Sequence, residues 1–262
     1  MDSPPSLSVL DTLRARAHEA AAHARVPYAG RPVGAALLLS DGLWVPGVRV
    51  ESASYPLTIP ALVGGWVAAV SAGRHDVRAV ALSQPFLPGA AAWLADALGA
   101  VVSADAPDAL AFGADPLADV GERLELPDAA PESDEAGVQR ARAVAERAHV
   151  PESGFHVGCV LVTESGRVVP GCNVEHTDWT RGLCAERAAL AVAAAYDAGP
   201  LQRLYLSCPT DPRGTPCGAC RQLLAEYAAG VPIVMDRGDA PPEITTAAAL
   251  LPQFFTGEQL RL

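Results

Sequence analysis

The sequence repeats itself at a constant spacing, and this limits the folds that the chain can adopt. Identical residues recur 124 positions apart in an unbroken register that extends to residue 207. Such self-similarity predicts two copies of one fold in tandem, and 262 residues are enough for two small domains. The matching pairs include Val26 and Val150, Gly34 and Gly158, Gly47 and Gly171, Glu51 and Glu175, and Ser83 and Ser207.

The boundary between the two copies falls in a segment with the composition of a linker. The stretch LPDAAPESDEAG, which begins at Leu126, is rich in proline, acidic residues and small residues. We therefore expect a first domain at 1–125, a linker at 126–136 and a second domain at 137–262.

Each copy shows the same coarse order of expected elements. A helix rich in alanine and arginine opens each copy, at about 8–24 and at 137–149. Strands that alternate with helices predict an α/β layered domain in which helices cover a mixed sheet. In the second copy the expected elements are strands at 157–163 and 167–174, a helix at 184–198, a strand at 203–207, a helix at 217–228 and a strand at 232–235.

Three cysteines in the second half have the spacing of a metal site. Cys184 starts the motif Cys-Ala-Glu-Arg, and Cys217 and Cys220 form a C-x-x-C pair that follows Pro216. Both motifs begin predicted helices, where the helix dipole and free N–H groups favour thiolates. Three protein ligands on zinc leave the fourth position open for water, which is the arrangement of a catalytic site.

Two residues beside the first cysteine have expected roles in the chemistry. Glu186 lies two positions after Cys184, next to the metal but not needed as a ligand, so its carboxylate can carry a proton from water to a substrate nitrogen. Three thiolates outweigh the charge of one zinc ion. Arg187 is placed to offset that excess through hydrogen bonds to ligand sulfur.

The cysteine pattern also has plainer interpretations. A C-x-x-C pair can hold a structural zinc or form a redox pair, and Cys159, Cys172 or Cys208 could close the site as a fourth ligand. The alternative for these three cysteines is a role as small core residues on strands.

Further motifs make the chain resemble the cytidine deaminase family, in its three-cysteine class. The resemblance covers 137–262 and, at lower fidelity, 8–120. It implies two tandem three-layer α-β-α domains with mixed sheets and one zinc ion per chain. The motifs are Phe155-His156-Val157-Gly158, similar to Phe-x-Val-Gly; Gly171-Cys172-Asn173-Val174-Glu175, similar to Gly-Cys-Asn-x-Glu; PCGACRQ from Pro216; and Leu250-Leu251-Pro252 through Phe255, similar to Leu-Leu-Pro-x-x-Phe.

The resemblance also implies roles for single residues. Hydroxide would attack C4 of cytidine or deoxycytidine, Glu186 would protonate N3 and then the amine, and ammonia would leave. Plainer alternatives are a core role for Phe155 and a solvated strand carboxylate for Glu175. The implied substrate contacts are Asn173 and Glu175 to the ribose hydroxyls, Phe155 to the base, Ala185 beside the metal ligand, and the carbonyl of Thr215 to the leaving amine.

The first half has lost the groups that this chemistry needs. Pro60 and Leu62 stand opposite Cys184 and Glu186, and Arg49 stands opposite Asn173. The first half is therefore expected to be a degenerate, non-catalytic copy.

One loop of the first half keeps a family pattern. The segment from Glu51 to Ile59 resembles the loop Glu-Asn-Ala-Ser-Tyr, which reaches a neighbouring subunit's site in four-subunit members. This implies that Ala53 and Tyr55 line the site built on Cys184, and that the chain forms a homodimer of four domain copies. Phe255 would reach a neighbour's base site, with Phe112 as the rival candidate.

Net charge and the variable loops bear on the substrate. The formal net charge is −11, and all 19 basic residues are arginines without a basic run, so we expect a small nucleoside and no nucleic-acid partner. Neither a membrane-spanning run nor an export signal is present, which predicts a cytoplasmic protein.

Departures from the family at 151–153 and 178–181 leave open a modified cytosine nucleoside or a nucleoside antibiotic as the substrate. A zinc-stabilised, non-enzymatic scaffold is the alternative of another class.

Overall fold

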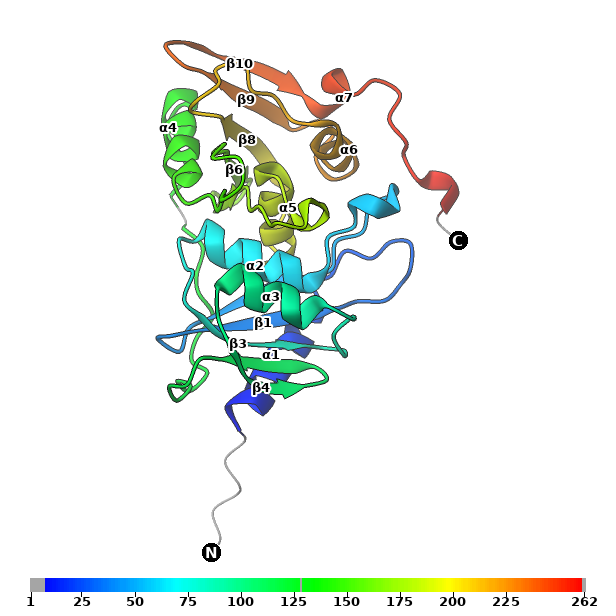
Figure 1. Ribbon diagram of the computed structural model, residues 1–262. Coiled ribbons are helices and arrows are strands. Elements are labelled where there is room, and N and C mark those ends of the chain that lie inside the picture. Colours follow the sequence, from blue (N-terminus) through cyan, green and yellow to red (C-terminus); the bar gives the residue numbers. More distant parts are fainter. Residues whose placement is uncertain (1–7, 128, 261–262) are drawn as a thin grey trace, which may run out of the picture.

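Two five-stranded sheets organise the chain, one in each half (Figure 1). The computed structural model describes residues 8–127 and 129–260. The first half contains α1 (Val9–Ala21), β1 (Gly34–Leu39), β2 (Trp44–Val48), η1 (Tyr55–Leu57), α2 (Ala61–Ser71), β3 (Val77–Leu82), α3 (Ala90–Leu98), β4 (Val102–Ala106) and β5 (Ala109–Phe112). The second contains α4 (Asp134–Ala145), β6 (Gly158–Thr163), β7 (Val168–Cys172), η2 (Trp179–Arg181), α5 (Ala185–Ala195), β8 (Leu201–Ser207), α6 (Gly218–Tyr227), β9 (Pro232–Arg237), β10 (Ala240–Thr246), α7 (Ala247–Leu250) and η3 (Glu258–Leu260).

Each half has the predicted α/β layering. Helix α1 packs on one face of the first sheet and α2 on the other, while α4 and α5 do the same for the second sheet. The interior strands β1 and β6 are buried along their whole length, because helices cover both of their faces.

Equivalent glycines make the same close contacts in both halves. A Cβ at Gly34 would lie 2.1 Å from the carbonyl oxygen of Ala17, and a Cβ at Gly158 would lie 2.0 Å from that of Ala141. A side chain at either position would therefore push the opening helix away from its sheet. The loop bonds repeat as well, because the carboxylate of Glu51 accepts from the N–H groups of residues 28 and 29 and that of Glu175 from those of 152 and 153.

The two sheets differ in the order of their last strands. The orders are β2-β1-β3-β5-β4 in the first half and β10-β9-β8-β6-β7 in the second. In the second sheet β9 pairs parallel to β8, which makes it a mixed sheet as predicted. In the first half β4 takes the edge and β5 returns antiparallel beside β3. The connection after β3 spans 83–101, shorter than the 208–231 that carries α6 to β9.

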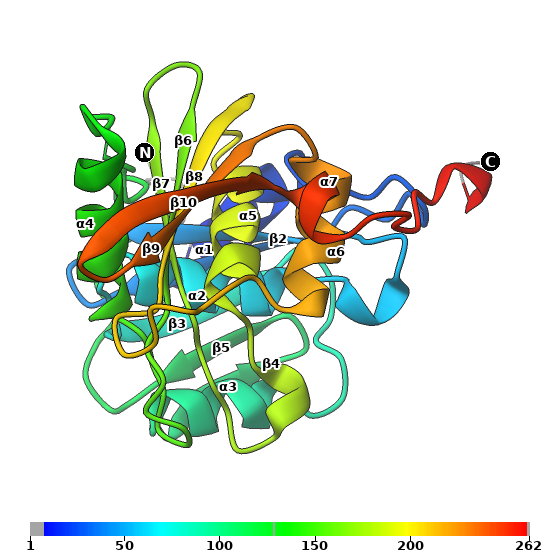
Figure 2. The ribbon, with the colours of Figure 1, turned by 90° about the horizontal axis from the view of Figure 1, so that it is seen from above.

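The halves meet through α2 and α5, which lie against each other between the two sheets (Figures 1 and 2). Polar contacts join them as well: Arg147 donates to the carbonyl of Ser71 at 2.7 Å, and the hydroxyl of Ser71 accepts from the N–H of Cys172 at 3.1 Å. The two sheets are thus held on one shared helical layer.

The connection between the halves is shorter than the sequence indicates. Ser133 caps α4 through its side chain, so residues 134–136, expected in the linker, belong to this helix. Upstream, Leu124 N–H donates to Trp44 and Val168 N–H donates to Pro127, which fastens the segment to both sheets. Within the described part of the chain, no helix has the length and apolar character needed to cross a membrane.

Candidate metal centre and active site

Three sulfur atoms meet where two helices of the second half begin. Cys184 is the N-cap of α5 and Cys217 is the N-cap of α6, with Cys220 one turn further on. The Cys184 and Cys217 sulfurs are 3.7 Å apart, and those of Cys217 and Cys220 are 3.5 Å apart. Tetrahedral bonds of about 2.3 Å to one zinc ion would put sulfurs about 3.8 Å apart. The cluster therefore fits this metal.

The site keeps an open position. Among the described residues, the group able to hold a metal comprises these three cysteines alone, with their ligand atoms within 4.8 Å of one another. Cys159 and Cys172 are fully buried on β6 and β7, as small core residues. Cys208 is also buried, but it lines the cavity beside the cluster. All six cysteines are free thiols.

The three thiols shift one another's pKa through hydrogen bonds. Hydrogen bonding with Cys184 and Cys220 lowers the pKa of Cys217. The bond with Cys217 raises the pKa of Cys184, and the bonds with Cys184 and Cys217 raise the pKa of Cys220. A cluster this tight holds one thiolate readily, and further loss of protons requires a cation between the sulfurs.

Glu186 lies in the first turn of α5 and is 3% exposed. Burial raises the pKa of its carboxyl to about 7, so at neutral pH this group can both accept and release a proton. It lines the same cavity as Cys184 and Cys217.

A cavity of about 620 Å³, here called the active-site cavity, opens over these groups. Its size is that of small-molecule sites. Of the predicted substrate contacts, Phe155, Asn173, Glu175 and Thr215 line it. Phe155 is 39% exposed, which excludes the plain core role that its sequence allowed.

The two predicted ribose contacts are also held by the protein. The Asn173 amide accepts from Val157 N–H and donates to the carbonyl of Phe155, both at 2.8 Å. The Glu175 carboxylate accepts from the N–H of Glu152 and from the N–H and hydroxyl of Ser153. Both groups are fixed at the cavity wall, and a carboxylate has about four acceptor sites, so acceptor capacity remains.

Arg187 makes a contact that the sequence does not indicate. Its Nη2 donates at 3.0 Å to the carbonyl of Leu57, which belongs to η1 of the first half. Its Nε is buried and has no hydrogen-bond partner among the described residues. The predicted bond to ligand sulfur is therefore not formed, and Arg187 joins the metal motif to the other half instead.

The other predicted contacts lie outside the active-site cavity of their own chain. Tyr55 is 83% exposed and Phe255 is 49% exposed. Ala53 is buried beside Gly257, and Ala185 is buried in the first turn of α5. Phe112 is buried in the core on β5, so it does not reach the base site of its chain.

Known proteins match this part of the chain. Residues 131–235 match the family described as the cytidine and deoxycytidylate deaminase zinc-binding region. A cytidine deaminase of Sporosarcina psychrophila is 36% identical over 124 residues, which are 47% of this chain and 91% of that relative.

The chain belongs to the cytidine deaminase family.

Other members of the family are similar to the chain to the same degree. A cytidine deaminase of Mycobacterium tuberculosis is 39% identical over 118 residues, covering 44% of this chain and 84% of that relative. The crystal structure of cytidine deaminase from Burkholderia pseudomallei is 35% identical, with 47% of this chain and 99% of that one covered and a TM-score of 0.44. With the zinc-binding family established, zinc is the cofactor that the three-cysteine cluster fits.

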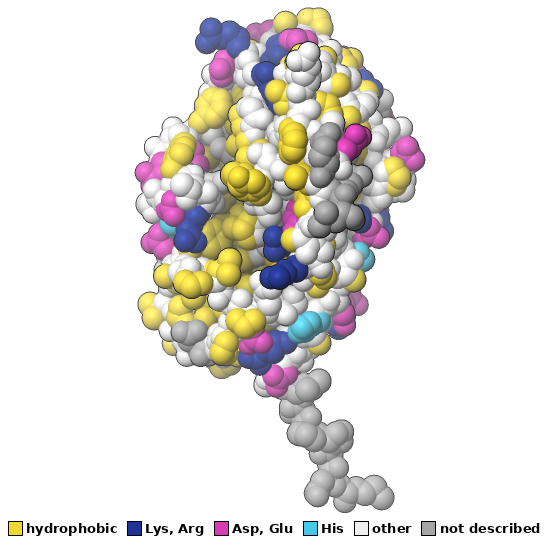
Figure 3. All heavy atoms as spheres, turned by 90° about the vertical axis from the view of Figure 1, so that its right-hand side faces the viewer, with side chains coloured by type: hydrophobic (Ala, Val, Ile, Leu, Met, Phe, Trp, Pro, Cys, Tyr) yellow, Lys and Arg dark blue, Asp and Glu magenta, His cyan; other side chains and the backbone are white. Residues whose placement is uncertain are grey.

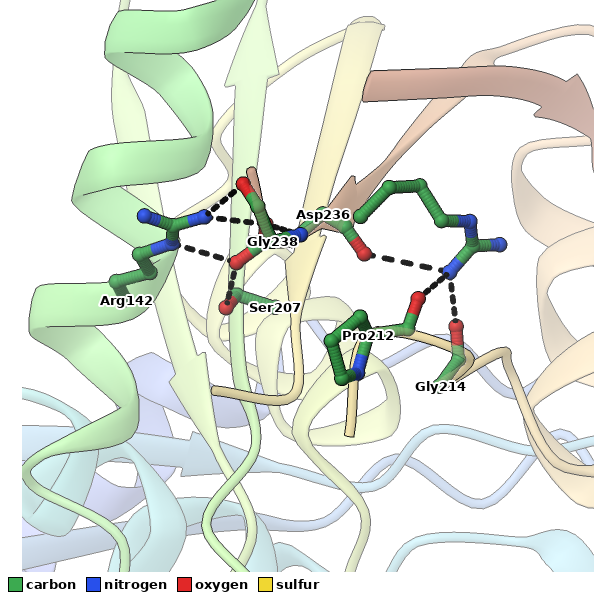
Figure 4. A network of polar contacts seen from close by, with 7 residues as sticks. Arg142, Ser207, Pro212, Gly214, Asp236 and Gly238 are labelled. Carbon is green, nitrogen blue, oxygen red and sulfur yellow. Dashed lines mark hydrogen bonds and ion pairs between the residues drawn. The ribbon is translucent and has the colours of Figure 1, made fainter. Parts of the chain in front are cut away.

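A polar network joins α4, β8 and β9 to the loop that contains Pro212 and Gly214 (Figure 4). Arg142 on α4 and Ser207 on β8 both donate to the buried carboxylate of Asp236 on β9. The next residue, Arg237, donates from Nη1 to the carbonyls of Pro212 at 2.9 Å and Gly214 at 2.8 Å. These bonds fix the loop that leads into Thr215 and Cys217. The sequence did not single out this loop, because its anchor lies on a strand after the last metal ligand.

The Arg237 clamp gives a first prediction. We expect Arg237→Gln to lower kcat/KM about tenfold, because charged hydrogen bonds to two loop carbonyls are lost and Gly214 lines the cavity. Steady-state kinetics with metal analysis measures this effect. Zinc content should stay at the wild-type level, and Arg167→Gln, on the β6–β7 turn, should match wild type. A kcat/KM equal to wild type in Arg237→Gln would show that the loop needs no clamp.

The Asp236 network gives a prediction on pH. Burial raises the pKa of Asp236, but hydrogen bonds from Arg142, Ser207 and the N–H of Gly238 outweigh it, so the net shift is downward. The ion pair therefore stabilises the fold fully above about pH 3.9, the pKa of an aspartate in the unfolded chain. This stabilisation is lost as the pH falls through the lower pKa of Asp236 in the folded protein. Arg142→Met should cost about 3 kcal/mol at neutral pH, because it leaves a buried charge unpaired.

Denaturant unfolding of both proteins from about pH 6 to pH 3 measures this difference. The difference in the free energy of unfolding between wild type and Arg142→Met should become smaller as the pH falls, because protonated Asp236 no longer needs its partner. Any metal loss in acid affects both proteins alike. A gap that stays constant would contradict the assignment to this ion pair.

Proposed function

We propose that the protein catalyses the hydrolytic deamination of cytidine and deoxycytidine to uridine and deoxyuridine, with release of ammonia. The observation that carries this proposal is the three-cysteine cluster on two helix N-termini, with buried Glu186 beside it in the active-site cavity. The cytidine deaminases that the chain matches support the same substrate.

The proposed mechanism assigns one task to each group of residues. Cys184, Cys217 and Cys220 hold zinc, which supplies Lewis-acid activation of water when it is bound. Glu186 takes one proton from the attacking water and delivers it to N3 of the base, and it then carries the second proton, from the hydroxyl formed at C4, to the departing amine. Its buried position suits this task, since its pKa lies near neutral pH.

The remaining residues bind and orient the nucleoside. Phe155 packs on the base, and Asn173 and Glu175 hold the ribose hydroxyls from the cavity wall. The carbonyl of Thr215 accepts a hydrogen bond from the leaving amine. Because Asn173 and Glu175 are already fixed by backbone partners, they present a preorganised surface to the sugar.

A panel of nucleosides, assayed with the metal content measured in parallel, tests the proposal. Cytidine and deoxycytidine should turn over with about one zinc ion per chain. The second candidate function is deamination of a modified cytosine nucleoside. It rests on Trp179, which lines the active-site cavity in a segment that differs from the family pattern. Faster turnover of such a nucleoside than of cytidine and deoxycytidine would favour it. A chain that binds zinc and deaminates no nucleoside would be a zinc-stabilised scaffold.

We further propose that the two halves are a fused pair of domain copies, 1–125 and 137–262, and that two chains form a homodimer in the cytoplasm. In both ribbon views η1 and the C-terminal segment project from one side of the molecule (Figures 1 and 2). Seen from that side, hydrophobic side chains gather around a hollow, with basic side chains at its edge (Figure 3). The exposed Tyr55 and Phe255 would there complete a partner's cavity, together with Ala53, while Ala185 stays beside the metal ligand of its own chain.

Tyr55→Ala tests this assembly. We expect kcat/KM for cytidine to fall about tenfold, because the loss of a ring that packs on the bound nucleoside costs on the order of 1.4 kcal/mol. Val101→Ala, at another large apolar residue that is 80% exposed, should match wild type. The mass in solution should be near twice the 27.0 kDa of one chain. A monomer, or full activity in Tyr55→Ala, would refute the proposed completion of the site.

A further inference from the structure

The first half contains a cavity at the position that corresponds to the active site. This first-half cavity has a volume of about 350 Å³, at the low end for small-molecule sites. Its lining residues Val33, Pro60 and Leu82 are the counterparts of Val157, Cys184 and Leu206 in the active-site cavity, each 124 positions earlier. The walls are thus built from equivalent elements.

The chemistry of this cavity has changed completely. Pro60 and Leu62 occupy the places of Cys184 and Glu186, so the first-half cavity has no metal ligand and no acid there. Arg49 occupies the place of Asn173. A second arginine, Arg181 of η2, enters from the other half, and its Nη2 would be 3.7 Å from a Cβ at Gly89.

The charge and the free donors of this cavity point to an anionic ligand. Among the described residues that line it, Arg49 and Arg181 are the charged ones, and both are positive. Nη2 of Arg49 also pairs with the buried carboxylate of Glu51 at 3.0 Å, behind the lining of the cavity, so a ligand would share this guanidinium with Glu51. Trp93 is 6% exposed, and its buried Nε1 has no hydrogen-bond partner in the described part of the chain. The same holds for Nε of Arg49. Buried donors without a partner are costly, and a ligand with several acceptors would satisfy them.

We propose that the first-half cavity is a binding site for a pyrimidine nucleoside monophosphate. Arg49 and Arg181 would hold the phosphate, as guanidinium groups do through paired hydrogen bonds, and the apolar wall with Trp93 would take the flat base. The choice of a pyrimidine rests on the proposed function. The anion site itself rests on the two arginines and the unpartnered donors alone.

Segment η2 connects this site to the active site. Trp179 lines the active-site cavity, while Arg181, two residues on, lines the first-half cavity. Arg181 is held by Asp178 at 2.9 Å, and a bound phosphate would compete with that carboxylate. His176 fastens the same loop to α3, with Nε2 3.1 Å from Asp96 and its ring 6.1 Å from that of Trp93. In Figure 2 the chain that precedes α5 reaches α3.

Calorimetric titration of the zinc-loaded, full-length protein with uridine 5′-monophosphate tests the site. Excess uridine, the product of the proposed reaction, keeps the active-site cavity filled during the titration. We expect one monophosphate per chain, and a Kd that rises at least tenfold in Arg181→Gln and in Trp93→Phe. Trp93→Phe removes the N–H and keeps an aromatic ring, although a smaller one than the indole. Arg167→Gln removes an arginine at the β6–β7 turn and should bind as wild type does. Inorganic phosphate should compete weakly.

Each result decides the proposal. Equal affinity in wild type and Arg181→Gln, or full displacement of the monophosphate by uridine, would overturn it. Because Arg181 is partly exposed, its replacement is not expected to unfold the chain. If no nucleoside of the panel is deaminated but the monophosphate still binds in a way that depends on Arg181, the proposed reaction is wrong and the proposed binding site stands.

A kinetic measurement tests the connection through η2 separately. The monophosphate should change KM for cytidine several-fold in wild type and leave it unchanged in Arg181→Gln. An unchanged KM in wild type with the monophosphate bound would overturn the coupling and keep the binding site.

Discussion

Replacement of Glu186 by glutamine is expected to lower kcat for cytidine about a thousandfold, within the range that general acid–base catalysis contributes. The side chain is 3% exposed at the floor of the active-site cavity, so bulk water has little access to take over its role. Glutamine keeps the volume and can still form hydrogen bonds, but it cannot pick up and release a proton. Single-turnover assays at neutral pH would measure the loss.

Two comparisons make the Glu186 result specific. Glu164→Gln removes a carboxylate from the exposed turn between β6 and β7 and should leave kcat unchanged. Zinc content in Glu186→Gln should stay near one ion per chain, because the metal group consists of the three cysteines. Activity within tenfold of wild type would assign the proton transfer to another group.

Replacement of Cys220 by alanine should remove both the metal and the activity. Cys220 is fully buried in α6, and its sulfur completes the three-cysteine group. Two remaining thiols hold zinc poorly, so we expect zinc to fall from about one ion per chain to near zero and kcat to fall below detection. Since the free energy of metal binding adds to that of folding, the thermal midpoint should drop as well.

The control for this variant is another buried thiol. Cys172→Ala removes a fully buried cysteine from β7, away from the metal group, and should keep zinc and activity despite some loss of packing. Metal analysis after gel filtration separates the two variants. Stoichiometric zinc in Cys220→Ala would mean that the metal is held elsewhere.

The metal centre was predictable because each of its two cysteine motifs is local and begins a helix. Cys184 and Cys217 each occupy the N-cap of a helix, and the pattern of the helix places Cys220 one turn after Cys217. The repeat likewise indicated which elements recur. Bonds such as those of Glu51 and Glu175 to their preceding loops follow from that register.

Contacts between distant segments were not predictable in the same way. Nothing in the Cys-Ala-Glu-Arg motif indicates that Arg187 donates to Leu57 across the boundary between the halves. The antiparallel return of β5 beside β3 depends on how a short connection folds back, which no residue pattern specifies. Arg237 holds its loop through backbone carbonyls, and carbonyl partners leave no trace in the sequence of the loop.

The packing of α2 against α5 has a consequence for how such a protein is made. Separate chains of an active and an inactive kind would pair at random, and many complexes would contain two of the same kind. A single chain enforces a one-to-one pairing at every concentration, because the tether makes the contact intramolecular. A mutation in one half is always inherited together with the other half, whose surface it contacts. The first half, which we propose to be non-catalytic, can therefore change its cavity toward another ligand, provided that it keeps α2 in place.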